Sequence, residues 1–224
     1  MNLKGKERGM MEKEHLLFDL DGTLTDPKEG ITKSVQYALN AFGIPAEDRE
    51  KLLCFIGPPL KDSFMEFYGF TEEEAGKAVI SYREYFKDKG MLDNQVYEGV
   101  HSVLEALLKK GKKLYVASSK PEIFVRKILE HFQLDSYFIF AGGADLEGTR
   151  GRKADVIRYV LKECQLTDRS KIVMIGDRKH DILGAKEVGI DSVGVLYGYG
   201  SRQELKDAGA ELIAETIFDL QNLL

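Results

Sequence analysis

The sequence predicts an α/β protein with a parallel, doubly wound sheet and an all-helical segment inserted early in the chain. The first observation is a set of short apolar runs, each suited to one buried strand. The second is that amphipathic helical patterns alternate with these runs over the later part of the chain. The third is a long stretch of purely helical pattern that separates the first apolar run from the others. Alternation favours a parallel sheet, and the helical stretch favours a second, smaller domain.

The apolar runs place the expected core elements along the chain. Strands are expected at residues 15–18, 113–117, 137–141, 172–175 and 192–196. Helices between them are expected at residues 100–111, 121–132, 154–164 and 180–188.

The helical stretch is expected to form its own domain over residues 26–95. Its aromatic residues recur at helical spacing, which is typical of the core of a small bundle. Thr71 and Glu74 stand in the register of a capping box and mark the start of one of its helices. The core domain then comprises residues 11–25 plus 96–224, and we expect residues 1–10 to be a flexible N-terminal extension.

Composition excludes several classes of partner. Lys and Arg number 32 against 37 Asp and Glu, a net charge of −5, so no global positive field would recruit nucleic acid or an anionic membrane. The one dense basic run, residues 109–113, lies where a helix is expected to end, and cations there complement the helix dipole. Cys54 and Cys164 lie far apart and indicate neither a disulfide nor a zinc site. Without an apolar leader or a membrane-length apolar run, we expect a cytoplasmic protein.

Two acidic residues follow the first expected strand. Asp19 and Asp21 are two residues apart, and Gly22 turns the chain directly after them. Side chains alternate along a strand, but the turn lets both carboxylates converge while Leu20 returns to the core. One carboxylate could hold a divalent cation and attack an electrophile while the other moves a proton, which suits phosphoryl transfer through an aspartyl-phosphate. An Asp-rich turn without chemistry is the plain alternative.

A serine pair follows the strand expected at residues 113–117. Ser118 and Ser119 precede Pro121, so a hydroxyl and free backbone N–H groups are expected to meet at a helix N-terminus. Such a corner binds phosphate readily, although an ordinary serine cap would look the same.

Two later segments add a cation and two acids at the same expected edge. Lys153 precedes a helix and could brace a phosphate against the nucleophile, although a lysine at a helix start is usually exposed. Asp177 and Asp181 follow the strand at residues 172–175 and would share a face if a helix began there. Mg²⁺ prefers oxygen ligands, and one or two such carboxylates beside Asp19 would suffice; a capping turn is the alternative.

Taken in chain order, these segments closely resemble the four motifs of the haloacid-dehalogenase superfamily of phosphatases. The matching residues are Asp19-Leu20-Asp21-Gly22-Thr23, Ser118, Lys153 and Gly176-Asp177 with Asp181. The resemblance covers residues 14–224 and implies a Rossmann-like core with an alpha-helical C1-type cap. Segments 55–60 and 194–200 resemble the bacterial phosphoglycolate-phosphatase branch, which includes 5′-nucleotidases.

The resemblance implies a catalytic role for three residues. Asp19 would be the nucleophile and a ligand of Mg²⁺. Asp21 would protonate the leaving oxygen, then activate water, and would offer its backbone carbonyl to the metal. Lys153 would offset the negative charge that Asp19 and the phosphate bring together.

It also implies how phosphate and metal are held. Ser118 and the N–H of Ser119 would bind the transferring phosphoryl oxygens. Asp177 would be a direct metal ligand, and Asp181 would act through water or orient its neighbours.

The expected reaction is therefore Mg²⁺-dependent hydrolysis of a small phosphorylated metabolite, such as phosphoglycolate, a nucleoside monophosphate or a sugar phosphate. A phosphomutase of the same fold and a non-catalytic regulatory protein are the alternatives. A dehalogenase is a weaker one, because that chemistry needs no metal ligand such as Asp177. Polar residues of the insertion, including Lys33, Tyr37 and Lys61, could face the substrate. The sequence leaves the substrate and the oligomeric state open.

Overall fold

The computed structural model describes residues 12–45, 48–147 and 149–224. The described residues form two compact units, one made of those up to Leu24 together with those from Val96 to Leu224, and the other of those from Thr25 to Gln95. The flexible extension expected for residues 1–10 lies outside the described residues.

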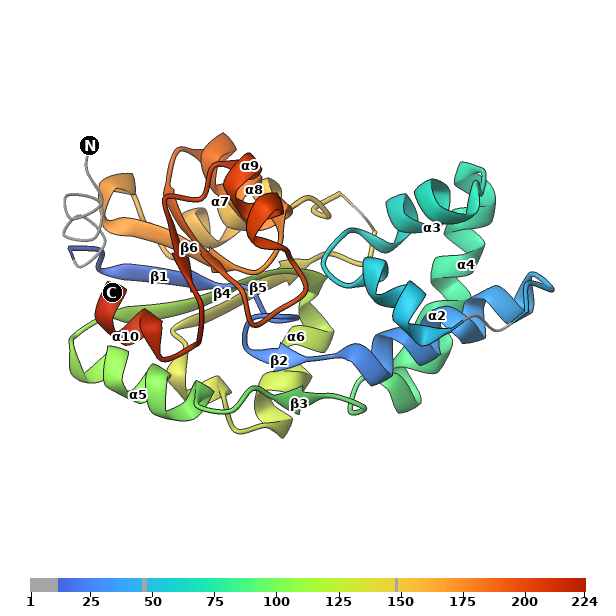
Figure 1. The fold of residues 1–224 in the computed structure, drawn as a ribbon, viewed down its shortest axis with the longest axis horizontal. Coiled ribbons are helices and arrows are strands. Elements are labelled where there is room, and N and C mark those ends of the chain that lie inside the picture. The colour runs from blue at the N-terminus through green and yellow to red at the C-terminus, as the bar shows by residue number, and fades with distance from the viewer. Residues whose placement is uncertain (1–11, 46–47, 148) are drawn as a thin grey trace. The chain divides into compact units, whose positions relative to one another are not determined.

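The first unit is built on a six-stranded parallel sheet (Figure 1). Its strand order is β5-β4-β1-β6-β7-β8, and each neighbouring pair is parallel. The strands are β1 His15–Phe18, β4 Lys113–Pro121, β5 Phe140–Ala144, β6 Ile172–Gly176, β7 Asp191–Val195 and β8 Leu212–Ala214. The predicted α/β fold with a parallel, doubly wound sheet is confirmed.

Helices cover both faces of this sheet, which explains why its strands read as continuous apolar runs (Figure 1). One face carries α7 Lys153–Glu163, α8 Lys179–Val188 and α9 Arg202–Ala208. The other carries α5 Val100–Lys109, α6 Glu122–His131 and α10 Asp219–Leu223. Leu17, Met174 and Ile157 are fully buried in the core between the sheet and the first of these helix layers.

The central position of β1 decides where the acidic residues meet. β1 lies between β4 and β6, and its last residue, Phe18, aligns with Val116 and Ile175. Parallel strands leave a sheet at the same edge, so the residues that follow β1 and β6 emerge next to the end of β4. In open α/β sheets, ligands bind at this carboxyl edge where the strand order reverses.

Two strands differ from the sequence prediction. β4 continues through Ser118 and Ser119 to Pro121, with an irregular register after Ala117, and therefore ends four residues later than expected. β5 begins at Phe140, because residues 135–137 form a short 3₁₀ turn. Its glycines gave no apolar signal, yet they fit the packing: a Cβ on Gly142 would lie 2.5 Å from the Val160 side chain of α7. β8 was not predicted.

The second unit is helical. It contains α2 Lys28–Ala41, the 3₁₀ segment η1 Arg49–Phe55, α3 Leu60–Tyr68, α4 Glu72–Tyr85 and the π turn η2 Phe86–Gly90. The predicted capping box begins α4, with Thr71 Oγ1 accepting from the Glu74 N–H and the Thr71 N–H donating to Glu74. The aromatic stripes pack as expected, with 5.0 Å between the ring centres of Phe55 and Phe64. Two-residue strands, β2 Thr25–Asp26 and β3 Gln95–Val96, pair where the chain enters and leaves the helices.

Candidate active site

The turn after β1 buries two carboxylates. The Asp19 backbone N–H continues the sheet by donating to the Ile175 carbonyl at 2.9 Å, and Leu20 is fully buried as expected. Asp19 Oδ1 accepts from the Leu20 N–H at 2.7 Å. Asp19 and Asp21 are only 4% and 8% exposed, which is costly for carboxylates unless opposite charge lies close by.

Lys153 supplies charge to Asp19 from the first residue of α7. Its Nζ lies 2.8 Å from Asp19 Oδ1 and 2.8 Å from Asp181 Oδ1, and it donates to the Ala117 carbonyl at 3.0 Å. Burial alone would lower the pKa of Lys153, but the charges of Asp181 and Asp19 outweigh it and raise that pKa above its ordinary value. Lys153 is therefore a fixed cation between two buried carboxylates.

A glycine on α8 makes room for the Lys153 side chain. A Cβ on Gly184 would lie 2.9 Å from Lys153 Cγ, closer than side chains normally pack. The two helices can approach each other there only because this position carries no side chain.

Asp177 and Asp181 converge without sharing a helix. α8 begins at Lys179, so Asp177 precedes the helix and Asp181 lies in its first turn; the shared helical face considered from the sequence is wrong. Asp181 Oδ2 accepts from the Arg178 N–H at 3.1 Å, which turns its carboxylate back toward the end of β6. Gly176 allows this approach, because a Cβ there would lie 2.2 Å from the Asp181 carboxyl carbon.

Three of these carboxylates form a group suited to a metal ion. Asp19, Asp177 and Asp181 each offer an oxygen, and these oxygens all lie within 4.8 Å of one another. Burial, followed by the charges of Asp181 and Asp19, raises the pKa of Asp177 well above its ordinary value. Burial also raises the pKa of Asp181, and Asp19 adds to the effect, although Lys153 opposes it. The three carboxylates together therefore place more negative charge in the cluster than the single cation Lys153 offsets.

The donor set fits a hard divalent cation. Asp177 Oδ1 is buried and has no hydrogen-bond partner among the described residues, whereas Asp177 Oδ2 accepts from the Tyr199 N–H at 2.7 Å. An unpartnered buried carboxylate oxygen is costly, and coordination of an oxygen-preferring ion such as Mg²⁺ would remove that cost.

The two serines lie on a strand and not at a helix start. The helix begins close to the predicted Pro121, at Glu122, but β4 continues to Pro121, so the expectation that the Ser118 hydroxyl and nearby N–H groups meet at the helix N-terminus is wrong. Ser118 is buried at the carboxyl edge, and its Oγ accepts from the Lys120 N–H at 3.4 Å. Ser119 is half-buried.

Lys120 is a charged site residue that the sequence reasoning missed. Its Nζ lies 2.8 Å from Asp21 Oδ2, and both side chains are almost fully buried. Burial raises the pKa of Asp21, and the charge of Lys120 opposes that rise. The predicted strand ended at residue 117, so alternation along it could not place Lys120 on the face of Ser118; that placement depends on the extension of β4 to Pro121.

The glycine-rich loop that contains Gly198 and Gly200 packs closely against Asp177. A Cβ on Gly198 would lie 2.3 Å from the Gly22 carbonyl oxygen, and a Cβ on Gly200 would lie 1.9 Å from the Asp177 carbonyl oxygen. Both positions therefore need glycine for close backbone approach. The sequence suggested this segment only as part of a family resemblance, without its contact to Asp177.

The polar residues of the helical unit considered for substrate contact are engaged within that unit. Lys33 Nζ lies 2.9 Å from Asp93 Oδ2, and Lys61 Nζ lies 2.6 Å from Glu72 Oε1. The Tyr37 ring lies 5.4 Å from that of Tyr85.

The parallel sheet and the buried Asp-Lys-Asp cluster at its carboxyl edge are typical of hydrolases of the haloacid dehalogenase class. The model of the family described as haloacid dehalogenase-like hydrolase matches residues 16–195, and the chain belongs to this family. The predicted family and enzyme class are confirmed.

The relatives carry names of phosphoryl-transfer enzymes. The chain is 50% identical to a 5′-nucleotidase of Pseudomonas aeruginosa over 86% of each protein. It is 36% identical to the tyrosine-protein kinase PtkA of Mycobacterium tuberculosis over 93% of this chain and 72% of that protein. A crystal structure described as a predicted phosphatase from Clostridium acetobutylicum matches with a TM-score of 0.91 and 49% identity, over 93% of this chain and 96% of the other. More distant relatives are named phosphoglycolate phosphatase, which agrees with the resemblance of segments 55–60 and 194–200 to that branch.

In the described part of the chain, no helix is long and apolar enough to cross a membrane.

Proposed function

We propose that this protein is an Mg²⁺-dependent phosphatase that hydrolyses small phosphomonoesters through an aspartyl-phosphate on Asp19. The observation that supports this most strongly is the buried cluster in which Lys153 Nζ lies 2.8 Å from both Asp19 and Asp181. A lysine so placed fixes one oxygen of Asp19 and leaves the other for a substrate. A bound Mg²⁺ would neutralise charge on the phosphoryl group. Asp19, Asp177 and the Asp21 backbone carbonyl would hold the ion, and Asp181 would orient these ligands.

In the first step, an oxygen of the Asp19 carboxylate attacks phosphorus, and the bond between phosphorus and the ester oxygen breaks. Asp21 gives its proton to that departing oxygen, which leaves as an alcohol. The Ser118 hydroxyl and the Ser119 N–H bind phosphoryl oxygens, and Lys153 offsets their charge.

In the second step, Asp21, now a carboxylate, takes a proton from water as the water oxygen attacks phosphorus. The bond between phosphorus and the Asp19 oxygen breaks, inorganic phosphate leaves, and both aspartates return to their starting states. Lys120, which lies 2.8 Å from Asp21 Oδ2, keeps that carboxyl in one orientation through both transfers.

The substrate class is a small soluble phosphate ester. The names of the relatives support nucleoside monophosphates and phosphoglycolate as first choices. The net charge of −5 and the lack of an apolar span in the described residues give no support for nucleic-acid or membrane partners.

The test is a phosphate-release screen with Mg²⁺ over nucleoside monophosphates, phosphoglycolate and sugar phosphates. Asp19→Asn should abolish turnover, whereas Asp21→Asn should impair proton transfer and retain metal binding. Conversion of one sugar phosphate into its positional isomer, dependent on a sugar bisphosphate and without phosphate release, would indicate the phosphomutase instead. Transfer from ATP to a tyrosine peptide without phosphate release would indicate the reaction for which one relative is named. Near-normal turnover by Asp19→Asn would refute the covalent mechanism.

A further inference from the structure

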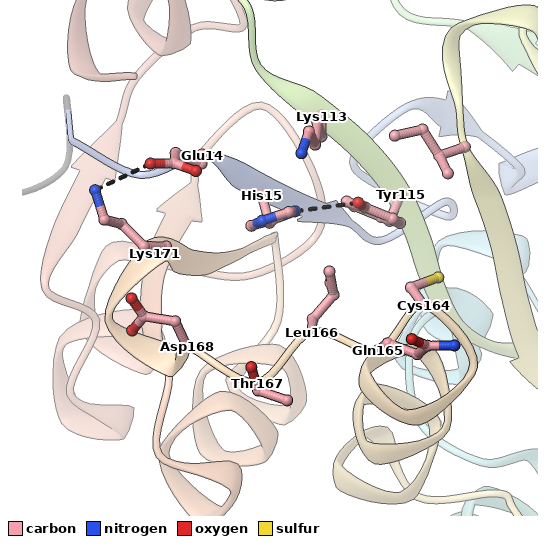
Figure 2. Close-up of a pocket in the computed structure, with 11 residues that line it drawn as sticks. Glu14, His15, Lys113, Tyr115, Cys164, Gln165, Leu166, Thr167, Asp168 and Lys171 are labelled. Carbon is pink, nitrogen blue, oxygen red and sulfur yellow. Dashed lines mark hydrogen bonds and ion pairs between the residues drawn. The ribbon is translucent and has the colours of Figure 1, made fainter.

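The first unit has a pocket at the end of the sheet opposite to the Asp19 cluster (Figure 2). His15 and Lys113, the first residues of β1 and β4, lie on one wall, and the loop that follows α7 forms the other. Its volume is about 480 Å³. That is within the range of roughly 300 to 1,000 Å³ that small-molecule sites occupy.

The acidic residues of this pocket already have partners. Glu14 Oε1 lies 3.0 Å from Lys171 Nζ (Figure 2). Asp168 Oδ1 accepts from the Ser170 N–H at 3.1 Å and from the Ser170 hydroxyl at 2.6 Å. Because these carboxylates are already ion-paired or hydrogen-bonded, they would gain little from a cationic ligand.

The donors of the opposite wall are available. The Lys113 side chain is exposed, and its ammonium has no hydrogen-bond or ion-pair partner among the described residues. His15 Nδ1 lies 3.1 Å from the Tyr115 hydroxyl (Figure 2). Burial, helped by the charge of Lys113, lowers the pKa of His15, and burial raises the pKa of Tyr115.

Both groups are therefore neutral near neutral pH, and we assign the hydroxyl proton of Tyr115 to the hydrogen bond with Nδ1. The single imidazole proton then sits on His15 Nε2, which makes no hydrogen bond within the described part of the chain. Lys113 and His15 therefore each offer a free donor group on this wall, and Lys113 also carries a positive charge.

Leu166 and Cys164 are the apolar residues of the wall formed after α7, which also carries Gln165, Thr167 and Asp168. Figure 2 shows the Leu166 side chain pointing toward His15, with Cys164 beside Tyr115. Burial raises the pKa of the Cys164 thiol, so it stays neutral and behaves as a small apolar group. Ile139 also lines the pocket and is 61% exposed.

We propose that this pocket binds a small organic carboxylate with an apolar body, its carboxylate between Lys113 and His15 and its body against Leu166, Cys164 and Ile139. The site is separate from the proposed phosphatase centre and does not depend on that function. The strands that form its wall also lead to that centre, because β1 runs from His15 toward Asp19 and β4 from Lys113 through Ser118.

The chain offers a direct probe, because it has four histidines whose imidazole signals can be followed by proton NMR. The His15 signal is identified by its loss in His15→Gln. Benzoate is titrated into the protein, with benzyl alcohol as the uncharged comparison. We expect benzoate to shift the His15 signal saturably and benzyl alcohol to bind at least tenfold more weakly, since it lacks the carboxylate.

A matched pair of variants tests the charge. Lys113→Gln removes the free ammonium, whereas Lys109→Gln removes an exposed lysine of the same basic run that does not line the pocket. Binding should weaken about tenfold in the first and stay unchanged in the second. His180 precedes Asp181 on α8 and reports on the catalytic edge. The proposal is overturned if benzoate does not saturate, if it shifts His180 in place of His15, or if Lys113→Gln binds as well as the wild type.

Discussion

Gly22→Ala tests whether close packing of two loops builds the metal site. Gly22 has φ +82°, and a Cβ there would lie 2.2 Å from Asp177 Oδ2, the oxygen that accepts from the Tyr199 N–H. Gly111 provides the control in the same unit, because its φ is +79° and a Cβ there would meet nothing within 4 Å.

Both variants incur the cost of placing a side chain in the left-handed region, about 1 to 2 kcal/mol. Only Gly22→Ala must also displace a buried carboxylate, and such overpacking costs about 1 to 3 kcal/mol more. For a chain of this size each kcal/mol lowers Tm by roughly 2 to 4 °C, so the two variants should differ by about 2 to 12 °C.

The assay is urea and thermal unfolding, combined with calorimetric titration of Mg²⁺. We expect Gly22→Ala to be the less stable variant and to bind Mg²⁺ weakly, because Asp177 has moved. Gly111→Ala should bind Mg²⁺ like the wild type. Equal stability and equal Mg²⁺ affinity in the two variants would refute the packing argument.

Three further predictions concern charge. Chelation with EDTA should abolish phosphate release and lower Tm, because the carboxylates of Asp19, Asp177 and Asp181 then repel one another; full turnover in excess chelator would contradict the metal assignment. Lys153→Met should lower the free energy of unfolding by about 3 to 5 kcal/mol, since it leaves buried carboxylates unpaired, whereas Lys162→Met, at an exposed position of α7, should change it by less than about 0.5 kcal/mol. Equal urea midpoints for these two variants would count against the ion pairs. Because burial lowers the pKa of His15, the unfolded chain takes up a proton there more readily, and His15 contributes stability that is lost as pH falls through the unfolded pKa of about 6.5. Between about pH 7.5 and pH 5.5 the wild type should therefore lose more stability in urea unfolding than His15→Gln does. His131→Gln, which changes an exposed residue, should follow the wild type. Identical pH slopes in all three proteins would show that His15 is not the group responsible.

The sequence predicted the alternating core because strand segments buried on both faces must be apolar, and residues 16–18, 114–117 and 172–175 are both buried and apolar. It also predicted the start of α4, because a capping box is a local signal carried by Thr71 and Glu74. The edge that collects Asp19, Ser118 and Asp177 followed from parallel strand geometry alone.

What could not be predicted depends on contacts between distant segments. β4 extends to Pro121 because that residue pairs with Ala144 of β5, and β5 itself consists largely of small residues without an apolar period. The contact of the Tyr199 N–H with Asp177 joins two loops that are 22 residues apart, and its geometry depends on glycines that lack any periodic pattern.

The central claim is that Asp19 becomes phosphorylated during turnover. The most direct measurement is borohydride reduction of the enzyme quenched during hydrolysis of a good phosphomonoester, followed by peptide mass spectrometry, because an acyl phosphate is reduced to an alcohol whereas a free carboxylate is not. The account predicts homoserine at position 19 that depends on substrate and Mg²⁺, and no reduced residue in Asp19→Asn. Reduction at another carboxylate, or rapid phosphate release with no reduced residue at position 19, would contradict it.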